Sequence, residues 1–186
     1  MDFREAENAV LNEVRRALDR VDPAAVEQMV QFLERAKSVF LAGAGRSGLM
    51  VRSFAMRLAH LGRSVQVVGD VTTRGIGQGD VLLVASGSGE TRGILAIAES
   101  AIEHGAKVGV ITIFPESPLA RLAEWHVVIP APTPKGARET SETSIQPMGS
   151  LFEQTLLVTL DVMVVMLMEK LGRTSEQMFK LHANLE

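Results

Sequence analysis

The chain contains no cysteine, and only four histidines are scattered over its 186 residues. The absence of cysteine excludes disulfides, thiolate metal sites and cysteine nucleophiles, and it is typical of a reducing compartment, so we expect a cytoplasmic protein. No two histidines have the His-x-x-x-His spacing, so the sequence predicts no zinc site and no other metal site. The histidines are His60, His104, His126 and His182.

The sequence also has no basic cluster and no long apolar run. Its formal net charge is −3, which argues against nucleic acid as a partner. Residues 1–7 are too charged for the apolar core of a signal peptide, so we expect no export. The longest unbroken apolar run near the C-terminus covers residues 162–168, far short of the ~20 residues that span a bilayer. We therefore expect no membrane partner either.

The apolar content that is present suffices for one buried core. At 186 residues and 46% hydrophobic content, the chain predicts a single domain that needs no disulfide or metal for stability. We divide this domain, residues 1–186, into N-terminal helices at 1–36, a sheet core at 37–170, and a C-terminal helix and tail at 171–186. The N-terminal part has apolar residues at helical spacing and predicts two helices, at about 2–19 and 23–36.

The interpretation of the whole chain depends most on residues 81–91. Residues 81–85 form a short run of valine, leucine and alanine, which favours a buried strand. Two glycines and two serines interrupt this run, and apolar residues at helical spacing resume from Ile94. A strand, a tight loop and a helix in this order direct the N–H groups of the loop and of the first helical turn at one point. The helix dipole favours an anion there.

The absence of lysine from this loop limits the kind of anion. A P-loop requires a Gly-Lys-Ser/Thr ending and a dinucleotide loop requires Gly-x-Gly-x-x-Gly, and neither pattern is present. The loop therefore suits a single phosphate ester, bound by the hydroxyls of Ser86, Ser88 and Thr91 and by the backbone at Gly87 and Gly89. Alternatively, Ser88 and Thr91 only cap the helix, and the glycines only turn the chain.

Short apolar runs elsewhere predict the rest of the sheet. Five short strands separated by helices predict an α/β fold, a doubly wound five-stranded parallel sheet with helices on both faces and the flavodoxin-like order 2-1-3-4-5. Besides 81–85, the strands are predicted at 39–42, 65–68, 108–112 and 127–129, with helices at 90–104 and near 117–123.

A second glycine loop, residues 43–48, follows the first predicted strand. In the order 2-1-3-4-5 this loop lies beside the loop at 86–91, at the edge of the sheet where ligands bind in such folds. We therefore assign Gly45, Arg46 and Ser47 to the same substrate site, with Ser47 facing the phosphate. Alternatively, the glycines allow a tight turn and close helix packing, and Ser47 caps a helix.

Residues 130–147 contain four prolines and no periodicity, so they predict a long loop. This loop can act as a lid, with Lys135, Arg138 and Glu139 near the sugar, or it can be merely solvated. A strongly apolar helix is predicted from about residue 149 to 170. Because this helix has so little polar surface, we expect it to pack against the sheet on one side and another subunit on the other.

Two residues of the C-terminal part are candidates for proton transfer. Glu153, near the start of the apolar helix, can serve as a base, or it can simply complement the helix dipole. His182 lies in the tail, where it is either a histidine at a frayed end or an active-site residue contributed across a subunit interface.

Four segments of the chain together resemble a known family. The Ser-Gly-Ser-Gly-Glu-Thr loop is similar to that of the sugar isomerase (SIS) family, which includes isomerases and phosphosugar-binding regulators. The segment at 146–154 and the tail at 182–186 resemble the 6-phospho-3-hexuloisomerases in particular, and the resemblance covers essentially the whole chain. The segments are Ala42-Gly43-Ala44-Gly45-Arg46-Ser47-Gly48, Ser86-Gly87-Ser88-Gly89-Glu90-Thr91, Gln146-Pro147-Met148-Gly149-Ser150-Leu151-Phe152-Glu153-Gln154 and His182-Ala183-Asn184-Leu185-Glu186.

The resemblance implies a homotetramer without a cofactor that interconverts D-arabino-3-hexulose 6-phosphate and fructose 6-phosphate. It places the enzyme in the ribulose monophosphate pathway of formaldehyde fixation or detoxification, with a functional link to 3-hexulose-6-phosphate synthase. The reaction moves a proton between C2 and C3 through an enediol, and related isomerases place their base at the position of Glu153. His182 is the candidate acid or proton shuttle, because an imidazole exchanges protons near neutral pH. Arg46 either stabilises the enediolate or forms a structural ion pair.

Two other functions remain open at this point. Another SIS-type aldose-ketose phosphate isomerase would share the loops and the base and differ only in its sugar. A non-catalytic phosphosugar sensor would need only the serine loops, usually with an attached DNA-binding or regulatory domain. We do not expect such a domain in 186 residues.

Overall fold

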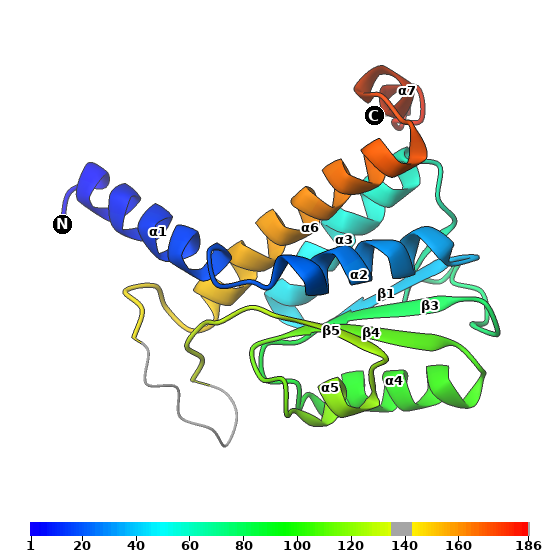
Figure 1. Ribbon diagram of the computed structural model, residues 1–186, viewed down its shortest axis with the longest axis horizontal. Coiled ribbons are helices and arrows are strands. Elements are labelled where there is room, and N and C mark those ends of the chain that lie inside the picture. Colours follow the sequence, from blue (N-terminus) through cyan, green and yellow to red (C-terminus); the bar gives the residue numbers. More distant parts are fainter. Residues whose placement is uncertain (135–142, 186) are drawn as a thin grey trace.

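A computed structural model describes residues 1–134 and 143–185 and shows a single parallel sheet (Figure 1). The strands lie in the order β2-β1-β3-β4-β5, and every neighbouring pair is parallel. This confirms the predicted doubly wound α/β fold. Because β1 lies beside β3, the two glycine loops leave the same edge of the sheet. The strands are Val39–Gly43 (β1), Val65–Val67 (β2), Val81–Ala85 (β3), Lys107–Thr112 (β4) and Trp125–Val128 (β5).

Helices cover both faces of the sheet, as predicted (Figure 1). On one face lie α2 (Pro23–Arg35), α3 (Gly45–His60) and α6 (Ser150–Leu171). On the other face lie α4 (Arg92–Glu103) and α5 (Pro118–Leu122). The first helix, α1 (Phe3–Leu18), contacts α6 and extends away from the sheet (Figure 1).

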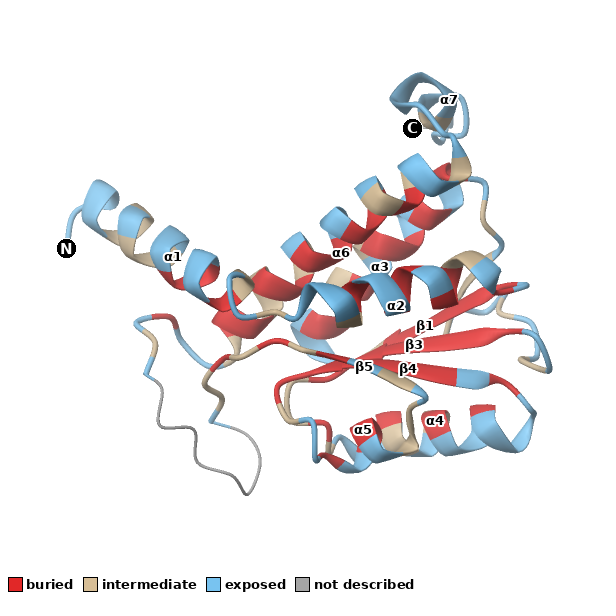
Figure 2. Ribbon diagram, in the orientation of Figure 1, coloured by how far each residue is buried: buried red, intermediate tan, exposed pale blue. Residues whose placement is uncertain are grey.

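The central strands are buried on both faces, which explains their unbroken apolar sequences (Figure 2). Along β3, Val81, Leu83 and Ala85 belong to the core shared with α2, α3 and α6. Leu82 and Val84 belong to a second core shared with α4 and α5. Alternate side chains of one strand thus support two separate helix layers.

The apolar helix α6 packs mainly against α1, α2 and α3, and its buried residues share one core with those of β1 and β3. Its main neighbours are thus other helices, whereas we expected the sheet. By length and composition alone α6 could cross a membrane, but half of its most apolar window is buried inside the protein. Its exposed apolar side chains, Val158, Val162 and Val165, leave a second face uncovered in the single chain.

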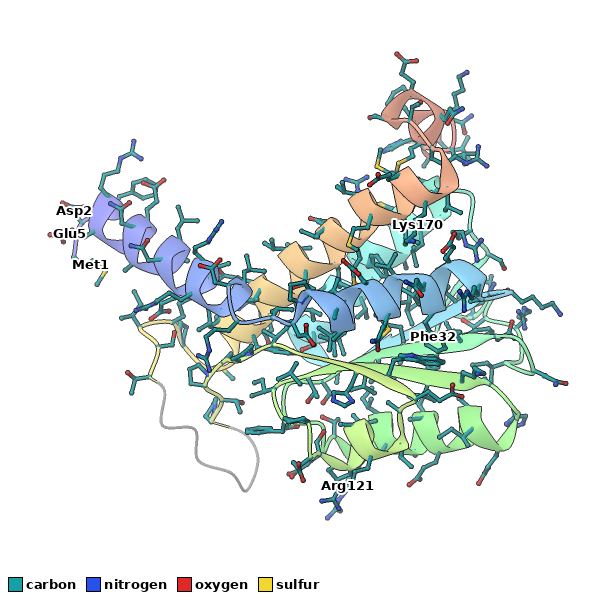
Figure 3. All side chains as sticks on the ribbon, viewed as in Figure 1. Met1, Asp2, Glu5, Phe32, Arg121 and Lys170 are labelled. Atoms are coloured by element: carbon teal, nitrogen blue, oxygen red, sulfur yellow. The ribbon has the colours of Figure 1, made fainter. Side chains whose placement is uncertain are left out.

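The helices nearest the two ends of the chain each begin with a capping box. At α1, Glu5 N–H donates to Asp2 Oδ1 (2.9 Å) and Asp2 N–H donates to Glu5 Oε2 (2.8 Å), at the far end of the helix labelled in Figure 3. At α7 (Ser175–Phe179), Gln177 N–H donates to Thr174 Oγ1 and Thr174 N–H donates to Gln177 Oε1. Phe32, also labelled in Figure 3, packs against the ring of Trp125, with centroids 4.0 Å apart, and so joins α2 to β5.

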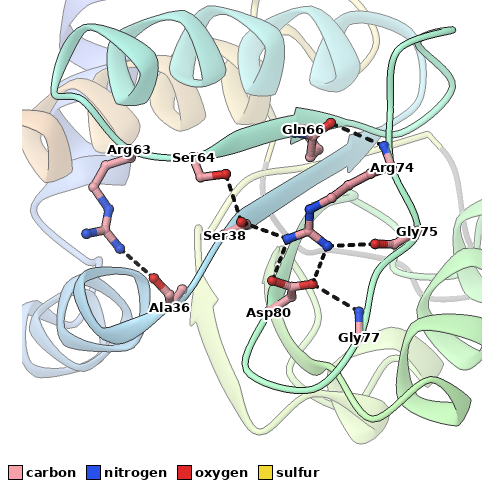
Figure 4. A network of polar contacts seen from close by, with 9 residues as sticks. All are labelled: Ala36, Ser38, Arg63, Ser64, Gln66, Arg74, Gly75, Gly77 and Asp80. Carbon is pink, nitrogen blue, oxygen red and sulfur yellow. Dashed lines mark hydrogen bonds and ion pairs between the residues drawn. The ribbon is translucent and has the colours of Figure 1, made fainter.

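Residues 68–80, all of which the structure describes, join β2 to β3 without a helix. A polar network holds this connection at the edge of the sheet opposite the glycine loops (Figure 4). Arg74 donates to both oxygens of Asp80 (2.8 Å each) and to Ser38 Oγ (2.8 Å), and Gly77 N–H donates to Asp80 Oδ2 (3.0 Å). The hydrogen bond from Arg74 outweighs the effect of burial and holds the pKa of Asp80 below its usual range.

Candidate active site

The glycine loops meet at the carboxyl ends of β1 and β3, where Gly43 and Ala85 are paired in the sheet. Together with the start of α6 and residues 133–134 and 147–149, they enclose a cavity of about 440 Å³. The cavity brings together the residues that the sequence assigned to substrate binding and catalysis, with two exceptions. Its lining includes Gly45, Arg46, Ser47, Ser86, Gly87, Ser88, Thr91, Thr133, Ser150 and Glu153.

Gly89 is the first exception, because it shapes the loop without lining the cavity. Its φ of +63° is in the left-handed region, and a Cβ at this position would overlap the side chain of Ser117. Leu119 N–H also donates to the Gly89 carbonyl (3.2 Å). A glycine is therefore required here for the backbone, whatever ligand the loop binds.

The serine loop is held in shape by its own hydroxyl groups. Gly89 N–H donates to the buried Ser86 Oγ (3.2 Å), and Glu90 N–H donates to Ser88 Oγ (3.3 Å). Ser86 Oγ also lies 3.4 Å from Thr91 Oγ1. A hydroxyl that accepts one bond still has a proton to donate, so the loop can offer these protons to a ligand oxygen without rearranging.

Three helices begin at this cavity, and in the part of the chain that the structure describes none of their N-cap side chains bonds to the first turn. Their N-cap residues are Ala44 for α3, Thr91 for α4 and Gly149 for α6. The other helices of the described chain begin with a side chain that accepts a bond from the first turn, namely Asp2, Asp22, Ser117 and Thr174. The N–H groups left unpaired at three helix starts, and the positive ends of three dipoles, therefore converge where an anion can bind.

This arrangement corrects the capping alternatives. Thr91 occupies the N-cap position of α4 without making a capping bond, and the Ser88 hydroxyl bonds only within the loop. Ser47 lies inside the first turn of α3 and does not cap it. The alternative for the glycine loop at 43–48, close packing of the helix against the strand, is confirmed. A Cβ on Gly48 would lie 2.6 Å from the Gly43 carbonyl oxygen.

Glu153 lies in the first turn of α6, beside Arg46 of α3. Arg46 Nη1 is 3.1 Å from Glu153 Oε2 and donates to Ser150 Oγ at 2.8 Å. The Glu153 side chain is 17% exposed, whereas that of Arg46 is 50% exposed. The carboxylate is thus oriented by one guanidinium and still faces the cavity, as required of a base that must reach a substrate carbon.

The apolar wall of the cavity was not predicted. Ile113, directly after β4, and Phe152 of α6 both approach Gly87 so closely that a Cβ there would lie 3.3 Å from each side chain. Pro134, Pro147 and Met148 complete this wall. No local sequence pattern marks these residues. The one signal is the position of Ile113 directly after β4, a strand that ends at the same edge of the sheet as β1 and β3. Lys135, Arg138 and Glu139, predicted to lie near the sugar, fall outside the described residues.

His182 is the second exception, because it lies beyond the other end of α6 from Glu153. The helix has 22 residues, roughly 33 Å at 1.5 Å per residue. His182 is exposed, its ring centroid is 5.2 Å from that of His60, and its Nδ1 is 2.9 Å from the Ala183 carbonyl oxygen. Within one chain, Glu153 and His182 therefore cannot act on the same substrate, and any joint role requires a second subunit.

The chain is similar to proteins of known family. Residues 32–159 match the SIS domain. The 3-hexulose-6-phosphate isomerase of Bacillus subtilis is 42% identical over 95% of this chain and 95% of its own length, and that of Mycobacterium gastri is 44% identical over 95% and 88%. A crystal structure from Methanococcus jannaschii, from which a 3-hexulose-6-phosphate isomerase function was inferred, is 28% identical with a TM-score of 0.84. It covers 98% of this chain and 99% of that protein.

Proposed function

The chain belongs to the SIS domain family, and we propose that it is an isomerase that interconverts D-arabino-3-hexulose 6-phosphate and fructose 6-phosphate. One structural observation carries this proposal. The uncapped starts of α3 and α4 and a row of hydroxyls face Glu153, in the first turn of α6, across a cavity of about 440 Å³. The cavity therefore offers an anion site and a base within reach of one small phosphosugar.

The phosphate end of the substrate binds to the two glycine loops. Ser47, Ser86, Ser88 and Thr91 supply hydroxyl donors, and the first turns of α3 and α4 supply backbone N–H groups. These donors are neutral, which suits a dianionic ester that must also be released after each turnover. The apolar wall beside Gly87, including Phe152 and Ile113, excludes water from the carbon chain.

Glu153 moves the proton between the two carbons. In the direction of fructose 6-phosphate, its carboxylate removes the proton from C2, an enediolate forms across C2 and C3, and the carboxyl group, which exchanges its proton with solvent, protonates C3, leaving the carbonyl at C2. Negative charge passes from Glu153 to the substrate oxygens during the first step. The guanidinium of Arg46, 3.1 Å from the carboxylate, is placed to stabilise that charge as it moves.

His182 of a neighbouring subunit completes this site in the proposed mechanism. It acts on the oxygen side, carrying protons between O2 and O3 of the enediolate. The distance between His182 and Glu153 within one chain and the uncovered valines on α6 both support an assembly of several chains, which we propose to be a homotetramer.

The two sugars differ in ring chemistry. In 3-hexulose 6-phosphate the only oxygen that could close a five-membered ring on C3 carries the phosphate, so this sugar is acyclic. Fructose 6-phosphate closes through its 5-oxygen, so the reverse reaction requires an open-chain fraction or a group that opens the ring. His182 is placed by the same proposal to do this as well.

In the cell, the enzyme would act after 3-hexulose-6-phosphate synthase in the ribulose monophosphate pathway. We propose a cytoplasmic location, no cofactor, and no nucleic acid or membrane partner.

Deuterium incorporation tests the function directly. The purified protein is incubated in heavy water with 3-hexulose 6-phosphate, fructose 6-phosphate, and aldose phosphates as controls. We expect exchange and product only between the first two sugars. Product formation from an aldose phosphate would favour another SIS isomerase, and binding of a phosphosugar without any exchange would favour a sensor.

A further inference from the structure

Glu13 of α1 is a buried carboxylate that the proposed reaction does not use. It is only 7% exposed, and it accepts hydrogen bonds from three donors in residues 144–146, far along the chain. The donors are the Ser144 hydroxyl (2.6 Å), the Ile145 backbone N–H (2.9 Å) and the Gln146 side-chain amide (3.0 Å). Since burying a carboxylate is unfavourable unless such bonds satisfy it, this cluster is a specific anchor.

The anchor continues into the helix that carries the base. Gln154 Nε2 donates to Gln146 Oε1 at 2.6 Å, and Gln154 follows Glu153 directly in the first turns of α6. Gln146 N–H also donates to Ser144 Oγ at 3.0 Å. One chain of hydrogen bonds therefore joins α1, residues 144–146 and the turn of α6 next to Glu153.

The anchored segment leads straight into the cavity wall. Pro147, Met148 and Gly149 follow Gln146, and all three line the cavity. Met148 has a φ of 57°, the one positive φ at a non-glycine residue in the described part of the chain. A side chain makes this conformation unfavourable, so it persists only where the surroundings hold it. Glu13 bonds to residues 144–146, just before Met148, and α6 begins at Ser150, just after it.

We propose that Glu13 is a positioning residue that holds residues 144–149 so that Met148 and Gly149 form the cavity wall and Glu153 faces the substrate. This role rests on the proposed isomerisation and deepens it. It also extends the site beyond the matched SIS domain, because Glu13 precedes residue 32, where that match begins.

The anchor needs a carboxylate in particular. Burial raises the pKa of Glu13, but the hydrogen bonds from Ser144, Ile145 and Gln146 and the charge of Arg16 outweigh this, so its pKa lies below the usual range. At neutral pH both oxygens are acceptors. A glutamine would replace one acceptor with an NH₂ group, which would then face other donors.

Glu13→Gln tests the proposal by two measurements. Backbone amide exchange at residues 144–146, 148 and 149 should become faster, which reports the anchor without any turnover. The kcat for 3-hexulose 6-phosphate should fall about 10- to 100-fold, because a small misplacement of reacting groups costs that much. Inhibition by inorganic phosphate should stay within about 2-fold, since the serine loops keep their own bonds.

Two control variants separate this role from a loss of stability. Val14→Ala leaves a cavity beside Glu13 on the same helix without touching its hydrogen bonds, so it should lower Tm and keep the wild-type kcat. Glu7→Gln removes a charge that pairs with Arg4, distant from the anchor, and should change neither. If Glu13→Gln does not fold, Gln146→Ala breaks the same chain of bonds and should lower kcat alike.

An unchanged kcat in a folded Glu13→Gln variant would overturn the positioning role. If that variant does not fold, an unchanged kcat in Gln146→Ala would overturn it. Unchanged amide exchange would do the same. Wild-type turnover and isotope exchange, measured alongside, test the proposed function separately. A wild-type protein without activity would reject that function, while the amide exchange would still decide whether Glu13 holds the segment.

Discussion

The guanidinium of Arg46 lies 3.1 Å from the carboxylate of Glu153, although the two residues come from different helices, α3 and α6. Arg46 lies in the glycine loop at 43–48 and Glu153 follows the segment at 144–149, so this contact joins the phosphate side of the cavity to the base. Half of the Arg46 side chain is exposed, so the pair contributes little to stability. Its importance is geometric, because it orients the carboxylate toward the cavity.

The variant Glu153→Gln shows whether Glu153 is the catalytic base or only a charge that complements the helix dipole. The amide keeps the size of the side chain but loses its basicity, so turnover and deuterium exchange should collapse while fructose 6-phosphate still binds. If Glu153 only complemented the dipole, the variant would lose roughly 0.3–1 kcal/mol of stability and keep its activity. Glu169→Gln, near the other end of α6, is the matched control and should retain full turnover. Wild-type exchange in folded Glu153→Gln would remove Glu153 from the mechanism.

The serine hydroxyls should determine phosphate affinity. Each lost bond to the charged phosphate should weaken binding by about 1.5–3 kcal/mol, so Ser86→Ala combined with Ser88→Ala should raise the Michaelis constant strongly. Each change also removes an acceptor within the loop, that of Gly89 N–H in Ser86→Ala and that of Glu90 N–H in Ser88→Ala, so Tm is measured alongside. Ser100→Ala, on the exposed part of α4, should behave like the wild type. Unchanged steady-state constants in the double variant would contradict the assignment.

A subunit-mixing experiment tests whether His182 serves a neighbouring site. Glu153→Gln and His182→Ala should each be nearly inactive. The two variants are then mixed in equal amounts, unfolded and refolded together. The hybrid assemblies contain some sites with an intact Glu153 from one chain and an intact His182 from its neighbour. If pairs of subunits share sites, about a quarter of the wild-type activity should return. Activity that stays absent in verified hybrids would place His182 outside the neighbouring site.

The uncovered valines on α6 should be buried in that assembly. Val162→Glu combined with Val165→Glu places charges on a face that we expect to be buried between chains, so sedimentation should show smaller assemblies than for the wild type. Turnover should fall with dissociation, because the smaller species lack the partner histidine. A wild-type protein that sediments as a monomer at micromolar concentration would refute the assembly.

Asp80 should contribute pH-dependent stability. Its pKa is lower in the folded chain than the ~3.9 of an unfolded aspartate, so the stabilisation is fully present above that value and is lost as the pH falls through the lower, folded-state pKa. Asp80→Asn should destabilise the protein by about 1.5–3 kcal/mol at neutral pH, the scale of a lost hydrogen bond to a charged group, and the difference from the wild type should shrink in acid. Asp70→Asn, in an exposed pair with Arg52, should cost under about 1 kcal/mol. Denaturant titrations at several pH values measure both, and a pH-independent difference would contradict this account.

Local chemistry in the sequence determined the sheet, its order and the two glycine loops. Short apolar runs, helical spacing and glycines act over a few residues, so Ser47, Ser86, Ser88 and Thr91 could be assigned to one cavity before their positions were known. The same local signals predicted the helix that begins at Pro23.

Only the tertiary structure decided which distant groups meet. The contacts of Arg46 with Glu153 and of Glu13 with Gln146 join elements that are remote in sequence, and packing of α1, α3 and α6 alone brings them together. The role of Gly89 also depends on a distant side chain, that of Ser117. His182 is the converse case: its residue type indicates proton transfer, but within one chain the length of α6 keeps it from the cavity, so its role depends on how the chains assemble.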